Sequence, residues 1–225
     1  MIKARSISGV LQFGTVLLSL FYFTSSFAQN RKADSLHALL VNEKSDTGKV
    51  MLMWKLADVV STYKPDTALQ IAQQALFIAK NIKYKEGESR SLGITAEIFR
   101  KIGNYPKALD FNLRKLKIEE TRQNQYNLAS VLMNIGIVYV FQEDYREGLK
   151  YYFQADSIIT THNIGSFKYN IALNVGDAYY RLNMTDSAYV YFNHSLQIAR
   201  QLGDGDLIGT SMTGMGHCYL SENDY

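Results

Sequence analysis

The side chains in this sequence that could ligate a metal or attack a substrate are few and scattered: His37, His162, His194, His217 and Cys218. No histidine has a second histidine at helical spacing, and no group of acids and histidines has metal-ligand spacing. His217 and Cys218 are neighbours, so their side chains point to different faces of a helix. The sequence also has no glycine-rich phosphate loop and no serine nucleophile elbow. We therefore predict no catalytic residue, no cofactor and no metal, and an enzyme would need a catalytic domain outside these residues.

Binding is the chemistry that the remaining polar residues could perform, and a repeat positions them. Gly136, Gly176 and Gly216 stand forty residues apart, and Ala96 stands forty residues before the first. An aromatic residue follows each of these four positions three residues later: Phe99, Tyr139, Tyr179 and Tyr219. A fixed period of this length predicts a stack of one supersecondary unit. Such stacks present long concave surfaces, which favours a function in holding another molecule.

Each unit of the array is predicted to be a helix, a short turn and a second helix, so the fold class is all-α. The array occupies residues 47–225, in units at 47–85, 86–125, 126–165, 166–205 and the incomplete 206–225. Asp66 and Asp186 are predicted to cap second helices at their amino termini. Cys218 shares its column with Ile98, Val138 and Ala178, so we expect a buried small hydrophobe.

The fifth unit stops at Tyr225, before the second helix that would cover its first. We therefore expect Met212, Met215 and Tyr219 to lack half of their packing partners. We also expect the chain to be a fragment, with an output domain in the part that follows.

The first residues have the pattern of an export signal. Lys3 and Arg5 precede an apolar run over about residues 10–27, and the small residues Ser26 and Ala28 suit signal peptidase. We predict a cleaved signal peptide over residues 1–28, followed by a lead-in helix and linker over 29–46. The alternative is a retained membrane anchor, although polar residues shorten the apolar stretch below the roughly 20 residues of a spanning helix. Either way the chain is predicted to be exported to the periplasmic side of the inner membrane.

The charge of the chain argues against nucleic acid as a partner. The formal net charge is +3, from 24 basic and 21 acidic residues. Removal of Lys3 and Arg5 with the signal leaves 22 basic and 21 acidic residues, which is a nearly neutral surface. Most of the 16 tyrosines fall in repeat columns, where packing explains them. Contact with a membrane is expected only through the signal peptide or a missing downstream segment.

One unit shows the resemblance to a known family most clearly. The apolar, glycine and aromatic positions of its first helix are Leu132, Ile135, Gly136 and Tyr139, and its second helix follows with Tyr145, Gly148, Leu149, Tyr152 and Ala155. This pattern resembles a tetratricopeptide repeat. The forty-residue spacing and the asparagines Asn134 and Asn174 resemble the longer repeats of peptide-sensing bacterial regulators and kinesin light chains. The resemblance implies an α-solenoid, a right-handed superhelix of antiparallel helix pairs with about four and a half repeats.

The resemblance also implies that the first helix of each pair lines a concave groove, which becomes the candidate site. Its face on three successive first helices carries an apolar band between two polar patches: Arg100, Lys101, Met133, Asn134, Ile137, Val140, Phe141, Asn170, Asn174, Asp177, Tyr180 and Arg181. This pattern suits an extended peptide with apolar side chains and a few charges. In the related peptide sensors, asparagines in the places of Asn134 and Asn174 bond the backbone of the bound peptide. The alternative is that these two side chains bond neighbouring helices.

The resulting functional expectation is a protein- or peptide-binding module. Exported chains with this layout resemble the sensory or scaffolding parts of membrane-anchored bacterial signalling proteins, such as sensor kinases and membrane-bound regulators. The alternative is a free periplasmic adaptor that assembles envelope proteins.

Overall fold

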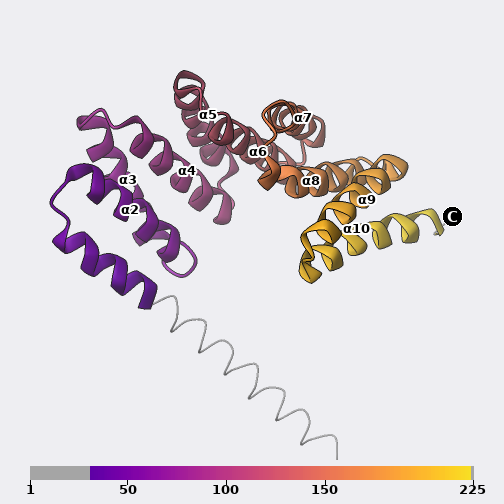
Figure 1. The fold of residues 1–225 in the computed structure, drawn as a ribbon, viewed down its shortest axis with the longest axis horizontal. Coiled ribbons are helices and arrows are strands. Elements are labelled where there is room, and N and C mark those ends of the chain that lie inside the picture. The colour runs from indigo at the N-terminus through magenta and orange to yellow at the C-terminus, as the bar shows by residue number, and fades with distance from the viewer. Residues whose placement is uncertain (1–30, 224–225) are drawn as a thin grey trace, which may run out of the picture. The chain divides into compact units, whose positions relative to one another are not determined.

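The computed structural model describes residues 31–223, and every regular element in this range is a helix (Figure 1). The predicted signal peptide and Tyr225 lie outside the described residues. After helical residues 31–42 come α2 (Asp46–Val60), α3 (Pro65–Asn81), α4 (Lys85–Lys101), α5 (Tyr105–Arg122), α6 (Gln125–Phe141), α7 (Tyr145–Thr161), α8 (Lys168–Arg181), α9 (Thr185–Leu202) and α10 (Gly205–Asn223). A short 3-10 turn, Gly165–Phe167, precedes α8. Within the described range, no helix is both long and apolar enough to span a membrane.

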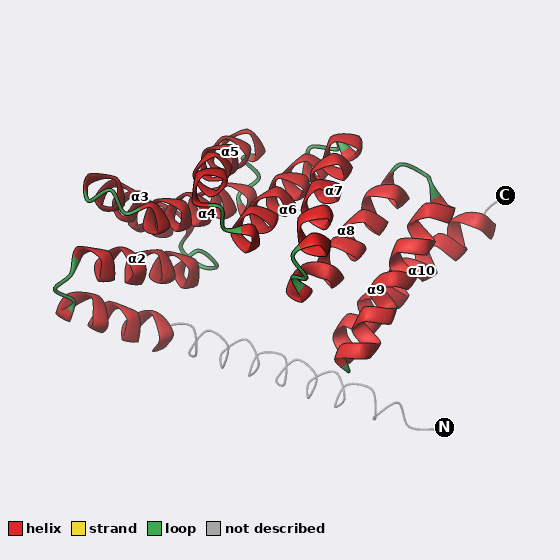
Figure 2. Cartoon of the chain, turned by 45° about the horizontal axis from the view of Figure 1, so that its top comes forward, coloured by secondary structure: helices red, strands yellow, loops and turns green. Residues whose placement is uncertain are grey.

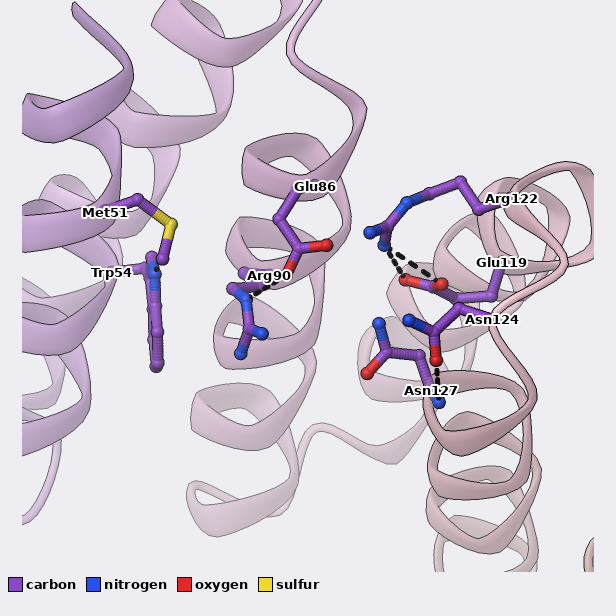
Figure 3. A network of polar contacts seen from close by, with 8 residues as sticks. All are labelled: Met51, Trp54, Glu86, Arg90, Glu119, Arg122, Asn124 and Asn127. Carbon is purple, nitrogen blue, oxygen red and sulfur yellow. Dashed lines mark hydrogen bonds and ion pairs between the residues drawn. The ribbon is translucent and has the colours of Figure 1, made fainter. Parts of the chain in front are cut away.

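The chain divides into two compact units, and the division falls inside α4, between Ile94 and Thr95. In the first unit α2 packs against α3, whose buried stripe consists of alanines and one leucine: Ala68, Ala72, Ala75, Leu76 and Ala79. Gly87 brings the start of α4 close to α2, since a Cβ atom there would lie 2.6 Å from Val50. Trp54 lies beside Arg90, whose guanidinium is 5.1 Å from the ring centre, and Arg90 is paired with Glu86 (Figure 3).

The second unit contains the end of α4 and helices α5 to α10 (Figure 2). From α5 onward each helix packs against the next one along the chain, and α8 also contacts both α6 and α10. The helices therefore form successive antiparallel pairs. The first helix of one pair contacts the first helix of the next, as α8 does with α6 and α10. This arrangement confirms the predicted all-α repeat fold.

Close approach of the two helices in a pair depends on the small residues of the repeat. A Cβ atom added to Gly136 on α6 would lie 2.5 Å from the ring of Tyr152 on α7. One added to Gly176 on α8 would lie 2.8 Å from the ring of Phe192 on α9. Because glycine leaves this space open, an aromatic ring of the second helix lies directly on the backbone of the first.

Aromatic pairs repeat with the same forty-residue period. Phe99 stacks on Phe111, Tyr139 on Tyr151, and Tyr179 on Tyr191, with ring centroids between 5.4 and 5.6 Å apart. Each pair joins the first helix of a unit to the second helix of the same unit. Packing therefore accounts for Tyr139 and Tyr179 of the predicted tyrosine columns.

The turns repeat at half that period. Residues with a positive φ occur at Lys83, Gly103, Gln123, Glu143, Asn163, Asn183 and Gly203, which are twenty residues apart. The left-handed conformation at these places ends one helix and directs the chain into the next. From α3 to α10, consecutive helices are therefore joined by turns that each contain one left-handed residue.

The capping prediction for Asp66 and Asp186 was wrong. The caps are Lys64 and Met184, neither of which makes a side-chain cap bond, while the two aspartates lie in the first turn of their helices. Pro65 takes the first helical position, which suits proline, so Asp66 lies two residues after the cap position. The negative charges of the two aspartates still stabilise the amino termini of their helices, where the helix dipole is positive. Asn104, Asn124 and Asp144 are side-chain caps, and Figure 3 shows Asn124 accepting the backbone N–H of Asn127.

One carboxylate is buried in the second unit. Glu119 of α5 is fully buried, and its two carboxylate oxygens lie 2.8 and 3.0 Å from the guanidinium of Arg122 (Figure 3). The ion pair compensates the charge that burial would otherwise make costly.

The exposed face of α10 agrees in part with the sequence expectation. Met212 is 55% exposed and Tyr219 is 52% exposed, whereas Leu132 and Ala172, which occupy the same column as Met212, are 5% and 3% exposed. Met215 is instead packed against the cluster around Phe192 and Cys218. Nothing lies within 4 Å of a Cβ atom placed on Gly216, so its side of α10 is open.

Candidate functional site

Two adjoining cavities in the second unit share one face of α8. The larger, of about 690 Å³, lies between α8, α9 and α10 and is lined by Leu173, Asn174, Asp177, Tyr180, Arg181, Phe192, Thr210, Thr213, Gly214 and His217. The smaller, of about 440 Å³, lies between α6, α7 and α8 and is lined by Ile137, Val140, Phe141, Glu143, Tyr145, Tyr152, Asn174, Asp177 and Arg181. Asn174, Asp177 and Arg181 belong to both linings. We call the two cavities together the α8 groove.

The structure brings together part of the predicted site. The residues that do line the α8 groove are Ile137, Val140, Phe141, Asn174, Asp177, Tyr180 and Arg181. The remaining predicted residues, Arg100, Lys101, Met133, Asn134 and Asn170, line neither cavity. Met133 packs against the core between α6 and α8, and Asn170 is exposed near the start of α8.

The predicted basic patch on α4 is already occupied by an acid of the same helix. Arg100 donates to both carboxylate oxygens of Glu97, at 2.9 and 2.6 Å, and Lys101 lies 3.7 Å from that carboxylate. The hydrogen bond with Glu97 raises the pKa of Arg100. Arg100 still contacts one residue of the groove, Phe141. The Phe141 ring lies 5.4 Å from the Arg100 guanidinium and stacks on Tyr105.

The side-chain amides of Asn134 and Asn174 bond to none of the residues that the structure describes. The alternative in which they bond neighbouring helices is therefore not what the structure shows. Both side chains are half-buried, and Asn174 faces both cavities of the groove. An amide in that position offers two donors and an acceptor to whatever enters.

Charge in the groove is concentrated on α8. Arg181 lies with its Nε atom 3.6 Å from Asp177, and the two side chains are 57% and 45% exposed. At this distance and exposure the pair is weak, so either group can turn to a bound molecule.

Tyr152 supplies a polar group from the second helix of the third pair. The residue is 2% exposed, its ring lies against Gly136, and it lines the smaller cavity. Its hydroxyl forms no hydrogen bond with any described residue. Burial, and then the charge of Asp177, raises the pKa of Tyr152 well above its usual range. The hydroxyl therefore stays protonated and can both donate and accept.

The sequence analysis missed two kinds of groove residue. One kind comes from the second helix of a pair, and the other comes from α10. Tyr152 and Phe192 come from second helices and enter because Gly136 and Gly176 leave room for their rings. His217 stands forty residues after Asp177, and Gly214 forty residues after Asn174, so continuing the two columns would have found them. His217 lies 5.8 Å from the ring of Tyr180. Gly214 lies against Phe192, so α10 has no side chain in the asparagine place.

The other candidate chemistry lies away from the groove or is absent from the described chain. Cys218 is 1% exposed and packs with Ala188 and Phe192, which confirms the prediction of a buried hydrophobe. Residues 31–223 contain no group of three or more His, Cys, Asp or Glu side chains that could hold a metal ion.

Neither a protein-family model nor a curated protein matches the chain, whereas solved structures match its fold. BtubC (BKLC) from P. vanneervenii is similar with a TM-score of 0.73 and 18% identity, over 88% of this chain and 82% of that chain. A Rap protein solved in complex with competence and sporulation factor has a TM-score of 0.75 and 17% identity, over 88% and 60% of the two chains. A signal-transduction ATPase with a tetratricopeptide repeat sensor, from Pyrococcus horikoshii, has a TM-score of 0.74 and 17% identity.

These similarities show a tetratricopeptide-like repeat fold. The chain covers 60% of the Rap protein, 52% of aspartyl phosphate phosphatase F from Bacillus subtilis and 29% of the Pyrococcus horikoshii ATPase. It therefore corresponds to only part of the length of these three proteins.

Proposed function

We propose that this chain is a protein-interaction module that holds an extended peptide segment of a partner in the α8 groove. The observation that carries the proposal is Asn174, whose amide faces both cavities and bonds to no described residue. A backbone segment that crosses α8 at this point would satisfy the amide on both its donor and its acceptor side. The Rap protein with a similar fold was solved with a bound factor, which supports this use of the fold.

The walls of the groove define the kind of peptide that fits. Leu173, Tyr180 and Phe192 line the larger cavity, and Ile137, Val140 and Phe141 line the smaller one. Each cavity is large enough for a side chain, while Asn174, Asp177 and Arg181 stand between them. The proposed ligand therefore places side chains on both sides of α8 and its backbone polar groups over α8.

For the cellular context we propose the sensory or scaffolding part of an exported, membrane-anchored signalling protein. The support is the signal-like pattern of residues 1–28 together with the repeat fold. The second candidate, a free periplasmic adaptor for envelope proteins, is favoured by the same two observations. The full gene discriminates the two: a spanning segment followed by an output domain supports the sensor, and a stop without either supports the adaptor. No enzyme activity is proposed for this chain.

The test of groove binding is selection of a random peptide library on the immobilised protein, followed by titration of the enriched peptides. We expect Asn174→Ala to weaken their binding about fivefold, which corresponds to roughly 1 kcal/mol for one hydrogen bond. Asn193→Ala, on α9 and outside both cavities, is the matched control and should bind as the wild type does. Thermal unfolding of both variants should change little.

Two results would count against this proposal. One is a library from which the wild-type protein enriches no peptide. The other is an Asn174→Ala variant that loses stability and keeps its affinity, which would make the amide structural. Asn134→Ala in the same assay determines whether the ligand extends along α6 beyond the smaller cavity.

A further inference from the structure

The lining of the smaller cavity combines apolar side chains with polar and charged ones, among them Tyr145, Asn174 and Arg181. Ile137, Val140 and Phe141 of α6 provide the apolar side. Glu143, in the turn after α6, Asp177 of α8 and the hydroxyl of Tyr152 provide the polar side. A side chain that fits here must itself be apolar along its length and polar at its tip.

The charges of this cavity do not balance. Its lining contains two carboxylates, Glu143 and Asp177, and one cation, Arg181, which is paired with Asp177 at 3.6 Å. The side chain of Glu143 forms no ion pair or hydrogen bond with any described residue. The nearby cation on α4, Arg100, is held by Glu97 at 2.6 Å. Glu143 is exposed, so water solvates its charge in the free protein, and the lining carries one net negative charge that favours a cationic ligand.

Tyr152 gives an independent indication that a polar group enters the cavity. Tyr152 is 2% exposed, and its hydroxyl has no hydrogen-bond partner among the described residues. The hydroxyl oxygen itself is not fully enclosed by protein, so it opens to the cavity, where water solvates it in the free protein. A purely apolar side chain in the cavity would cover the hydroxyl and leave it unsatisfied, at a cost of about 1–3 kcal/mol. An acidic side chain would meet Glu143 and Asp177. A basic side chain avoids both costs.

We propose that the smaller cavity selects a lysine or arginine side chain of the bound peptide. Its methylene groups pack on Ile137, Val140 and Phe141, and its cationic head reaches Glu143, Asp177 and the Tyr152 hydroxyl. This specificity rests on the proposed peptide-binding function and adds to it the residue class that the peptide must contain.

The test compares three versions of the protein in the same random-library selection. Peptides enriched on the wild type should contain an excess of lysine and arginine at one position. Glu143→Lys should remove that excess and favour aspartate or glutamate there. Lysine fits the backbone of this turn, since Lys83 occupies the equivalent place with a φ of 57° against 63° for Glu143. Glu120→Lys, an exposed residue of α5 outside both cavities, makes the same change in net charge and should keep the wild-type preference.

Direct titration gives the size of the effect. Peptides enriched on the wild type should bind Glu143→Lys about 5- to 20-fold more weakly, since an attraction of partly exposed charges is replaced by a repulsion. The same peptides should bind Tyr152→Phe about 3- to 10-fold more weakly, with the largest loss for those that contain the basic residue.

The possible failures are distinct. If no peptide is enriched on the wild type, the peptide-binding function itself is lost. If peptides are enriched without a basic preference, or if Glu143→Lys keeps that preference, groove binding stands and the proposed specificity is overturned. Folding of each variant is checked by circular dichroism.

Discussion

The side-chain oxygens of Ser195 on α9 and Ser211 on α10 lie 2.9 Å apart, and both residues are fully buried. Tyr169 of α8 joins them: its hydroxyl donates to the Leu207 carbonyl at 3.0 Å and lies 3.4 Å from the oxygen of Ser211. In the same column as Ser195, Ala75 and Ala155 are also fully buried. The apparent departure from alanine at Ser195 is thus one end of a polar junction between three helices.

Because of this junction, we expect a serine-to-alanine change in a helix to lower the free energy of unfolding, although alanine has the higher helix propensity. Ser195→Ala should lower the free energy of unfolding by about 1 kcal/mol, because the hydrogen bond to Ser211 is lost in a buried place. Ser157→Ala, an exposed position on α7, is the control and should be neutral or slightly stabilising, since alanine has the higher helix propensity. Urea unfolding measures both. Equal effects of the two changes would show that the junction contributes no net stability.

Two glycines of one repeat column should respond in opposite directions to alanine. Gly136→Ala places a methyl group 2.5 Å from the Tyr152 ring and 3.0 Å from the Gly148 carbonyl oxygen, so we expect a loss of about 2 kcal/mol or more. Gly216→Ala has nothing within 4 Å and should gain up to about 1 kcal/mol from helix propensity. Thermal and urea unfolding of the two variants test this. A stable Gly136→Ala protein would mean that α6 and α7 can separate without cost.

The raised pKa of Tyr152 predicts a loss of stability at alkaline pH. In the unfolded chain the tyrosine titrates near 10, whereas in the folded protein burial keeps it protonated to higher pH. Its contribution is therefore full below pH 10, and above that pH the free energy of unfolding falls by up to about 1.4 kcal/mol per pH unit. Tyr152→Phe should reduce this slope.

Some alkaline dependence should remain in that variant, since the pKa values of Tyr139 and Tyr191 are also raised, mainly by burial. Urea unfolding between pH 8 and 11 gives both slopes. Identical slopes for the wild type and Tyr152→Phe would show that Tyr152 ionises as freely in the folded protein as in the unfolded chain.

The repeat fold could be predicted because the small and aromatic positions that define it are local in sequence. Gly136 and Gly176 are each followed by an aromatic residue at a fixed distance, and the same spacing sets the packing of each pair. The resemblance to tetratricopeptide repeats implied that first helices line the groove, and helical periodicity then placed Asn174, Asp177 and Arg181 on one face of α8. The resemblance and the periodicity together were therefore sufficient for the central part of the site.

The depth of the groove could not be predicted in the same way. Tyr152 reaches the smaller cavity from the second helix of its pair, which depends on how closely α6 and α7 approach. Arg100 and Lys101 were predicted as groove residues, but they line neither cavity and pair instead with Glu97, which is near enough in sequence to lie on the same helix face. Whether Asn174 bonds a neighbouring helix depends on side-chain orientation, which periodicity leaves open.

The turns at twenty-residue intervals limit how this sequence can change in length. One residue inserted between two successive left-handed positions, such as Gln123 and Glu143, would rotate the later part of that helix by about 100°. Its packed face would then turn away from both neighbours, as would any groove residue beyond the insertion. Loss or duplication of forty residues would instead preserve every column. Natural length variants of this array should therefore differ by whole helix pairs, with smaller insertions confined to the turns.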